Sequence, residues 1–380
     1  MEKELVVTQT ITRLTSLTIP PELGLRRDPP PRAKVTSEAF WDLYDSTTLF
    51  YTAIYDAVVR QLHVFAPPML NFSLVVKRAQ FYLNGQKLDA PHVIHAEKFD
   101  QLIFVNIPSG SILTMAVDGT ESAMPVLSCD SARFAGRRVV YTMSRNNDLA
   151  WIKDWMIWNQ QMHKADAVLI VDNGTTAYEA DELAATLRSV AGYNRAEVMQ
   201  VPSRYGPDIT TAHRAQDGAF LQTALMNAFW MLWLRYARAV LNVDVDELIV
   251  SASGEAIFDA VESATFGLVM ATGHWRYAAP GSPVVRHRDH TLMLPGDTAC
   301  PPKYCLRPDG LAARQTLKVH GVKNFKRVPF VNREHFTFLH CRNISTSWKY
   351  DRSKCDYGAM VEDSETKTLL KQVYSETIRE

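Results

Sequence analysis

The spacing of hydrophobic residues changes along the chain and divides it into regions. Residues 1–35 show no regular pattern and end in a proline run. Apolar residues then recur at helical spacing between about residues 37 and 62, which predicts a helix. From residue 69 to about 127, short alternating runs predict a β-rich module of about five strands, with a hairpin at Asn84-Gly85. We therefore expect an irregular segment (1–35) followed by an accessory module of one helix and several strands (36–135).

Strand-like and helix-like patterns alternate from residue 138 onward. Strands are expected at 139–143, 167–171, 197–201 and just before Asp244, and helices at 149–162, 179–190 and 211–236. Such alternation favours right-handed βαβ units and a mainly parallel, Rossmann-like sheet with helices on both faces. The prediction is an α/β domain at 136–345, followed by a helical tail at 346–380.

Polar residues follow three of these strands, at the sheet edge where ligands of α/β folds bind. The most informative group is Asp244-Val245-Asp246-Glu247, which has apolar residues on both sides. Carboxylates at i and i+2 of a strand end point the same way and offer oxygen ligands to Mg2+ or Mn2+, ions that also take phosphate oxygens. By the same alternation, Glu247 is expected to point away from Asp246 and to have a structural role. The alternative is an Asp-rich surface turn.

The other two groups also allow two interpretations. Asp172 and Asn173 can accept hydrogen bonds from a base or a ribose, or they can form a simple Asx turn before Gly174. Arg145 can contact a phosphate, or it can pair with a carboxylate of the fold. Lys318 belongs to a basic stretch that suits a diphosphate and equally suits a solvated loop.

Composition narrows the partners and the compartment. Lys+Arg and Asp+Glu are equal at 41 each, so no net field favours nucleic acid. Five cysteines without a C-x-x-C array predict free thiols in a reducing compartment. Neither a secretory leader nor a spanning segment is recognisable, which predicts a cytoplasmic protein, with peripheral contact at the inner membrane as the alternative. Serine hydrolase, zincin and P-loop motifs are absent from the sequence.

Taken in order, the motifs resemble those of the metal-dependent GT-A glycosyltransferases, especially the family 92-like branch and its family 2 relatives. The resemblance covers about residues 138–350 and rests on Arg145-Asn146, Asp154-Trp155, Val171 to Thr175, Val243 to Glu247, His274 to Tyr277, Pro302 to Tyr304, Lys318 to Gly321, and Leu339 to Arg342 with Lys349. The chain departs from the usual pattern at four positions, namely Asn147, Asp154, Thr175 and Cys341.

This resemblance implies a hexosyltransferase that uses a nucleotide diphosphate sugar, in our expectation a UDP-sugar, and a glycan hydroxyl, with inversion, in surface polysaccharide synthesis. A Mn2+ or Mg2+ ion would be held by Asp244, Asp246 and a late histidine, with His340 preferred and His320 second. The expected donor-binding residues are Arg145, Asn146, Asp172, Asn173, Asp244 and Lys318. The general base stays open among Asp289, Asp297 and Glu334. The alternatives are a metal-dependent nucleotidyltransferase and a non-catalytic glycan-binding protein on the same fold.

Overall fold

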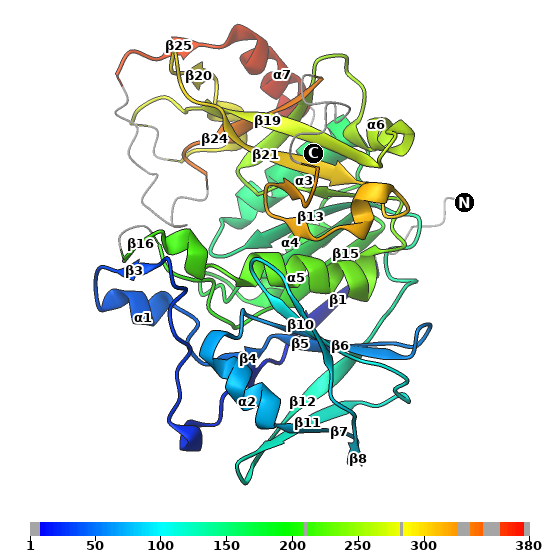
Figure 1. The fold of residues 1–380 in the computed structure, drawn as a ribbon. Helices are drawn as coiled ribbons and strands as arrows, with labels where there is room; N and C mark the ends of the chain where they lie inside the picture. The colour runs from blue at the N-terminus through cyan, green and yellow to red at the C-terminus, as the bar shows by residue number, and fades with distance from the viewer. Residues whose placement is uncertain (1–7, 209–210, 282–283, 326–334, 345–357, 376–380) are drawn as a thin grey trace. The chain divides into compact units, whose positions relative to one another are not determined.

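The computed structural model describes residues 8–208, 211–281, 284–325, 335–344 and 358–375 (Figure 1). The chain forms two compact units, each built from separate stretches of sequence. The α/β unit comprises residues 1–12, 134–200 and 236–380, and the β-rich unit comprises residues 13–133 and 201–235. The segment 201–235, expected within the α/β domain, therefore groups with the N-terminal module.

A nine-stranded sheet forms the centre of the α/β unit, in the order β1-β15-β14-β13-β17-β21-β19-β24-β18. Its strands are β1 (Thr8–Arg13), β13 (Arg138–Ser144), β14 (Ala167–Asp172), β15 (Arg195–Gln200), β17 (Ala239–Asn242), β18 (Glu247–Ser251), β19 (Leu268–Arg276), β21 (Cys300–Leu306) and β24 (Phe336–Cys341). β15, β14, β13 and β17 pair in parallel, as do β19 and β24, whereas β21 and β18 pair antiparallel to their neighbours. The predicted α/β fold class is confirmed.

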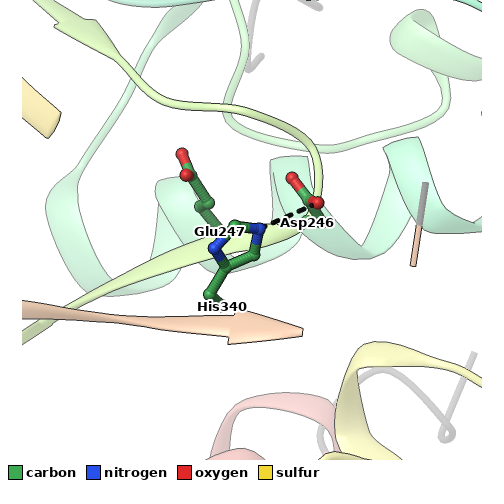
Figure 2. A group of neighbouring side chains, drawn as sticks. All are labelled: Asp246, Glu247 and His340. Carbon is green, nitrogen blue, oxygen red and sulfur yellow. Dashed lines mark hydrogen bonds and ion pairs between the residues drawn. The ribbon is translucent and has the colours of Figure 1, made fainter. Parts of the chain in front are cut away.

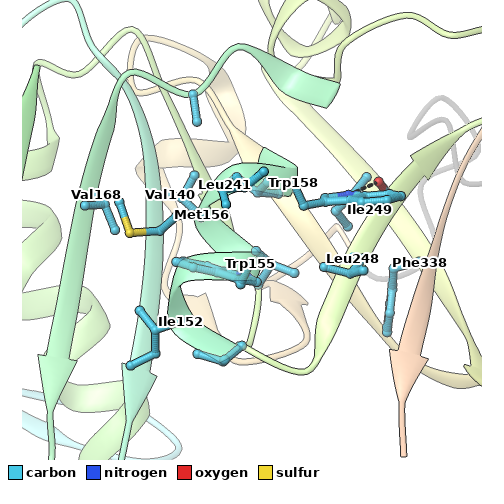
Figure 3. Close-up of a cluster of buried hydrophobic side chains, with 14 of the residues drawn as sticks. Val140, Ile152, Trp155, Met156, Trp158, Val168, Leu241, Leu248, Ile249 and Phe338 are labelled. Atoms are coloured by element: carbon cyan, nitrogen blue, oxygen red, sulfur yellow. Dashed lines mark hydrogen bonds between the residues drawn. The ribbon is translucent and has the colours of Figure 1, made fainter. Parts of the chain in front are cut away.

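Among the described residues of this unit are four α-helices: α3 (Leu149–His163), α4 (Ala180–Arg188), α6 (Ile257–Ser263) and α7 (Ser364–Ser375). Asp148 caps the N-terminus of α3, and its carboxylate accepts a hydrogen bond from the Ala150 N–H at 2.7 Å. Its Trp155 and Trp158 are fully buried in the core (Figure 3). The Trp158 indole N–H donates to the Ile249 carbonyl at 2.8 Å, so the core fixes β18 against α3. Both α3 and β18 also carry residues of the candidate site described below, namely Asp154 and Glu247.

Several predicted elements of the α/β unit are found close to their expected positions. The expected strands correspond to β13, β14, β15 and β17, and the expected helices at 149–162 and 179–190 correspond to α3 and α4. The long helix predicted at 211–236 is wrong in extent. The structure has β16 (Ala212–His213), a 3-10 turn (Ala215–Gly218), α5 (Leu221–Phe229) and a π-helical turn (Trp230–Leu234). Gly218 disfavours a continuous helix, and the buried apolar run begins only at Phe220.

The β-rich unit contains an eight-stranded sheet in the order β8-β7-β11-β12-β5-β6-β10-β9. Its strands are β5 (Thr52–Asp56), β6 (Gln61–Ala66), β7 (Gln80–Leu83), β8 (Gln86–Lys87), β9 (His92–His95), β10 (Asp100–Phe104), β11 (Ile112–Val117) and β12 (Thr120–Ser128). Six of its strands, β7 to β12, lie in the stretch where about five were expected, and β5 and β6 precede it. The predicted hairpin is confirmed, because Asn84 (φ 47) and Gly85 (φ 82) join β7 to β8 with the positive φ values of a type I′ turn.

The helix predicted at 37–62 is wrong. Only α1 (Ala39–Leu43) is helical, and β4 (Thr48–Phe50), β5 and β6 follow it. Every residue from 48 to 56 is buried, so this segment lacks the polar face that an amphipathic helix presents to water. Its threonine, isoleucine and aromatic residues suit a strand that is covered on both faces.

The remaining elements are short. They are β2 (Leu17–Thr18), β3 (Lys34–Val35), α2 (Ser73–Arg78), β20 (Leu292–Met293), β22 (Leu317–Lys318), β23 (Gly321–Val322), β25 (Val361–Glu362) and the 3-10 turns η1 (Pro21–Leu23), η2 (Leu70–Phe72), η5 (His287–Asp289) and η6 (Leu311–Arg314). No helix within the described ranges is long and apolar enough to cross a membrane. Cys129, Cys300, Cys305 and Cys341 are free thiols.

Two buried histidines of the α/β unit are held as neutral rings. His163 Nε2 lies 2.9 Å from the Ile249 carbonyl, while its Nδ1 accepts the Ile257 N–H at 3.2 Å. His290 shows the reverse tautomer, since its Nδ1 lies 3.0 Å from a backbone carbonyl and its Nε2 accepts a backbone N–H at 3.3 Å. A second ring proton on either histidine would face an N–H group, so protonation breaks the accepted hydrogen bond.

We expect acidification to destabilise the α/β unit. Burial lowers the pKa of His163 to about 4 and that of His290 to about 3, whereas unfolded histidine titrates near ~6.5. The unfolded state therefore binds these protons first, and stability falls as the pH drops below about 6.5, by about 1.4 kcal/mol per pH unit for each histidine. Urea titrations at pH 7 and pH 5 measure this loss, and His163→Gln should reduce it. Equal unfolding free energies at both pH values would contradict the prediction.

Candidate functional site

Residues Asp244 to Glu247 form a tight turn between β17 and β18. The Glu247 N–H donates to the Asp244 carbonyl at 3.0 Å, and the Glu247 carboxylate accepts the Asp244 N–H at 2.9 Å. The turn lies at the carboxyl end of β17, the sheet edge where β13 ends at Ser144 and β14 ends at Asp172. The chain turns here instead of continuing as a strand, so the alternation used for the prediction does not apply. The prediction that Glu247 points away from Asp246 is wrong.

Asp246, Glu247 and His340 form one buried cluster (Figure 2). One ligand atom from each of the three side chains lies within 4.8 Å of the other two. His340 Nε2 is 3.1 Å from an Asp246 carboxylate oxygen, and Glu247 lies opposite His340 in the β18–β24 ladder. Two carboxylates and one imidazole are ligand types that divalent ions take in proteins. The cluster could therefore hold a metal ion.

Neighbouring strands fix the His340 ring in place. Trp275 of β19 lies beside His340 of β24, and the two rings stack with centroids 3.9 Å apart and an interplanar angle of 17°. The Cys341 N–H donates to the Asp246 carbonyl at 2.8 Å, which ties the acidic turn to the end of β24. Trp275 thus packs its ring on the candidate ligand His340.

Asp244 lies outside this three-residue cluster and pairs with a lysine. Its carboxylate is 2.5 Å from Lys303 Nζ, and the same ammonium is 3.1 Å from Glu247. Lys303 is fully buried on β21, while the Asp244 side chain is about one-third exposed. Burial raises the pKa of the Glu247 carboxyl, and the Lys303 ammonium opposes that shift. Of the two aspartates predicted as metal ligands, only Asp246 joins the cluster with His340.

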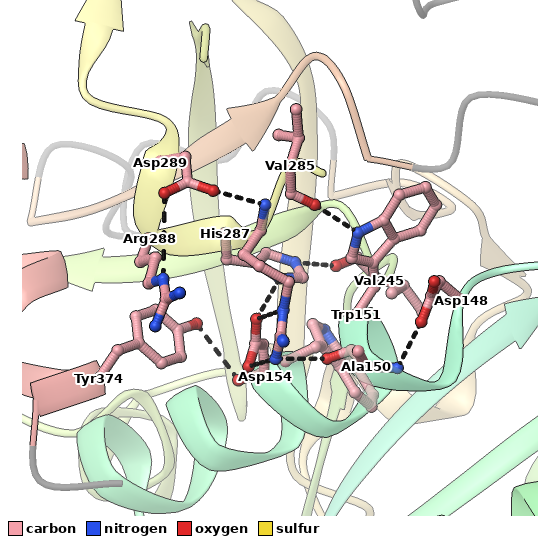
Figure 4. Close-up of polar contacts among 12 residues, drawn as sticks. Asp148, Ala150, Trp151, Asp154, Val245, Val285, His287, Arg288, Asp289 and Tyr374 are labelled. Carbon is pink, nitrogen blue, oxygen red and sulfur yellow. Dashed lines mark hydrogen bonds and ion pairs between the residues drawn. The ribbon is translucent and has the colours of Figure 1, made fainter. Parts of the chain in front are cut away.

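A polar network beneath the turn links it to α3 (Figure 4). Asp154 of α3 accepts a hydrogen bond from Arg286 Nε at 2.7 Å and lies 3.7 Å from His287 Nδ1. The other nitrogen of that ring, Nε2, lies 2.8 Å from the carbonyl of Val245, which is inside the acidic turn. Burial would raise the pKa of Asp154, but the neighbouring His287 ring and the Arg286 guanidinium outweigh it and lower that pKa. Asp154 therefore helps to position the acidic turn through the His287 ring.

Two of the predicted donor-binding residues, Asn146 and Asp172, lie where β13 and β14 end and make hydrogen bonds within the loops there. Asn146 has a left-handed backbone (φ 53), and its side-chain oxygen accepts the Thr176 N–H at 2.8 Å. Asp172 is buried and accepts the Thr175 N–H at 3.1 Å, three residues on in its own loop rather than two as in an Asx turn. Asn173 is buried beside it, and Arg145 is exposed at the start of the first loop.

Lys318 and His320 belong to a small hairpin formed by β22 and β23. The Asn242 side chain donates to the Val319 carbonyl at 3.0 Å, which places this hairpin at the end of β17. His320 is exposed, and its Nδ1 lies 3.3 Å from the Pro302 carbonyl. The structure thus brings His340, and not His320, into the cluster with Asp246.

Neither described candidate for a general base belongs to the metal-type cluster. Asp289 accepts the Arg286 N–H at 2.8 Å and closes the η5 turn. Asp297 is exposed and accepts hydrogen bonds from the Tyr277 hydroxyl and the Thr298 N–H. Glu334 and Lys349 lie outside the described residues.

Sequence reasoning missed Glu247 and Lys303 as members of the site. A signal for each was present in the sequence. Glu247 stands directly beside the two aspartates, and Lys303 is followed by the apolar run Tyr304-Cys305-Leu306 of a buried strand. A lysine directly before such a buried run needs an acidic partner, because a buried unpaired ammonium is costly.

Comparisons with known proteins add little to this description. No protein-family model and no curated protein matches the chain. Among solved structures, one described as "Crystal Structure of a Mycobacterial Protein" matches 66% of this chain and 76% of its own chain, with 10% identity and a TM-score of 0.28. The candidate function therefore rests on the residues of the site.

Proposed function

We propose that the protein is a metal-dependent glycosyltransferase that moves a hexose from a nucleotide diphosphate sugar to a glycan hydroxyl. The observation that carries this proposal is the buried cluster of Asp246, Glu247 and His340 at the carboxyl edge of the parallel strands. Asp172 is the last residue of β14, which lies two strands from β17 in the sheet, and Asn173 follows it at the same edge. A UDP-linked donor, inversion and a role in surface polysaccharide synthesis are parts of the proposal that rest on the GT-A resemblance.

The ligand types of the cluster fit a divalent cation. Mg2+ strongly prefers oxygen ligands, whereas Mn2+ also accepts imidazole nitrogen, so His340 favours Mn2+. When bound, such an ion neutralises the charge that grows on a diphosphate leaving group. Asp246 and His340 would hold it, and Trp275 stacking keeps the imidazole in the required orientation.

Other residues of the edge suit the donor and the acceptor. Asp172 has one carboxylate oxygen bonded within its own loop, and the second can accept a hydrogen bond from a ribose or a base. Lys318 on the hairpin beside β17 suits a phosphate oxygen. Inversion needs a general base that takes the proton of the acceptor hydroxyl. The candidates are Asp289, Asp297 and Glu334, the last of which lies outside the described residues.

A donor-hydrolysis assay tests the proposal. The purified protein is incubated in the presence of Mn2+ with each member of a panel of nucleotide diphosphate sugars. In separate reactions, also with Mn2+, it is incubated with nucleoside triphosphates. We expect slow hydrolysis of one nucleotide diphosphate sugar, with UDP-sugars first, and loss of this activity in EDTA. Turnover of a nucleoside triphosphate with a sugar phosphate would identify a nucleotidyltransferase instead. Binding of a glycan without turnover of either class would indicate a non-catalytic protein.

A further inference from the structure

Lys303 is an unusual residue at the candidate metal site, because its ammonium is fully buried among carboxylates. Its Nζ is 2.5 Å from Asp244 and 3.1 Å from Glu247. A buried amine placed against two carboxylates at these distances is an ammonium in a paired, hydrogen-bonded position. Within the turn, Asp244 and Glu247 therefore already have a positive partner, whereas Asp246 faces His340 on the other side.

The charges of the acidic turn differ on its two sides. Asp244, Asp246 and Glu247 supply three carboxylates within four residues, and Lys303 is the cation that the structure places against two of them. Closely spaced carboxylates that share no cation repel one another, and enzymes with two metal ions often place them about 3.5–4 Å apart in such acidic sites. An ammonium can serve the same electrostatic purpose without exchanging with solvent.

We propose that Lys303 is a fixed cation of this centre, in the place beside Asp244 and Glu247 that a second divalent ion would otherwise take. The centre then has a single exchangeable cation, on the Asp246–His340 side. Lys303 is a positioning residue in this view: it holds the acidic turn in shape whether or not the exchangeable site is filled. The inference rests on the proposed metal site, but its test does not depend on glycosyl transfer.

The test counts metal ions and measures stability. Lys303→Met removes the charge and keeps much of the side-chain volume, so Asp244 and Glu247 are left without their partner. Isothermal titration with Mn2+ should show one more ion bound per chain than in the wild-type protein. The melting temperature of the variant in EDTA should be lower than that of the wild type, and Mn2+ should raise it by more than it raises the wild type.

Two matched variants separate this role from simple packing. Lys303→Arg keeps the charge and should bind the same number of ions as the wild type. Lys303→Met combined with Asp244→Asn removes one acid together with the cation, and the additional ion should be lost. If Lys303→Met is unfolded in EDTA, Mn2+ is expected to restore its far-UV circular dichroism spectrum. Equal Mn2+ numbers in Lys303→Met and wild type, or an unfolded variant that Mn2+ does not rescue, would overturn the inference.

The outcome is distinguishable from a failure of the proposed function. A protein that hydrolyses no nucleotide sugar can still bind one more Mn2+ after Lys303→Met, which would retain the fixed cation and reject the transferase. Conversely, donor hydrolysis with unchanged metal numbers would retain the transferase and reject the role of Lys303.

Discussion

Asp246→Asn is expected to lower Mn2+-dependent donor turnover by about 10²–10³-fold, the size of loss typical when one charge-stabilising group of an active site is removed. The substitution keeps the shape of the side chain but removes the negative charge beside His340, whose Nε2 is 3.1 Å from the carboxylate. An amide oxygen is a weaker ligand than a carboxylate, so Mn2+ affinity should fall together with turnover. Titration with Mn2+ and initial rates at saturating donor measure the two effects.

Stability should change little in the same variant. The Asp246 carbonyl keeps its hydrogen bond from the Cys341 N–H, and an uncharged amide relieves repulsion within the acidic turn. Asp181→Asn, at an exposed position in the first turn of α4, is a matched control that should retain full activity. Turnover by Asp246→Asn within threefold of the wild type, at the same Mn2+ concentration, would exclude Asp246 as a metal ligand.

The parallel part of the sheet could be predicted because its strands are short apolar runs separated by helices of ordinary length. β14 is buried throughout, as the run Ala167 to Val171 suggested, and α3 and α4 have recognisable ends. The same pattern located the acidic turn at the end of β17. Local signals of this kind depend on hydrophobic spacing, which the sequence displays directly.

The missed features depend on contacts that are distant in sequence. The strands β4 to β6 read as a helix because a run buried on every side has no diagnostic period. Glu247 belongs to the cluster because residues 244–247 form a turn rather than a strand. The hydrogen bond between the His287 ring and the Val245 carbonyl holds that turn in place. Lys303 stands 59 residues after Asp244, a pairing that no local pattern reports.

Arg27 presents the same difficulty in the β-rich unit. It lies in the segment predicted to be irregular, just before the proline run, where an arginine is ordinarily exposed. In the structure it is fully buried, and its guanidinium donates to the carbonyls of Pro68 (2.9 Å), Asp45 (2.8 Å) and Thr48 (2.5 Å). It also lies 4.7 Å from the centre of the Phe72 ring. One side chain thus anchors the N-terminal segment to the strands and turns of the unit.

Arg27→Met is therefore expected to destabilise the β-rich unit by about 3–5 kcal/mol, because it leaves three carbonyls without their donor and each such loss costs about 1–3 kcal/mol, partly offset by relaxation. Arg27→Lys keeps the positive charge but not the planar fork, so it should recover only part of the loss. Amide hydrogen exchange of β5 and β6 measures the effect, with β13 and β14 of the α/β unit as the reference in the same sample. Wild-type protection of β5 and β6 in Arg27→Met would mean that the guanidinium contributes no net stability. Faster exchange there, partly reversed in Arg27→Lys, would show that the three donated hydrogen bonds stabilise the segment.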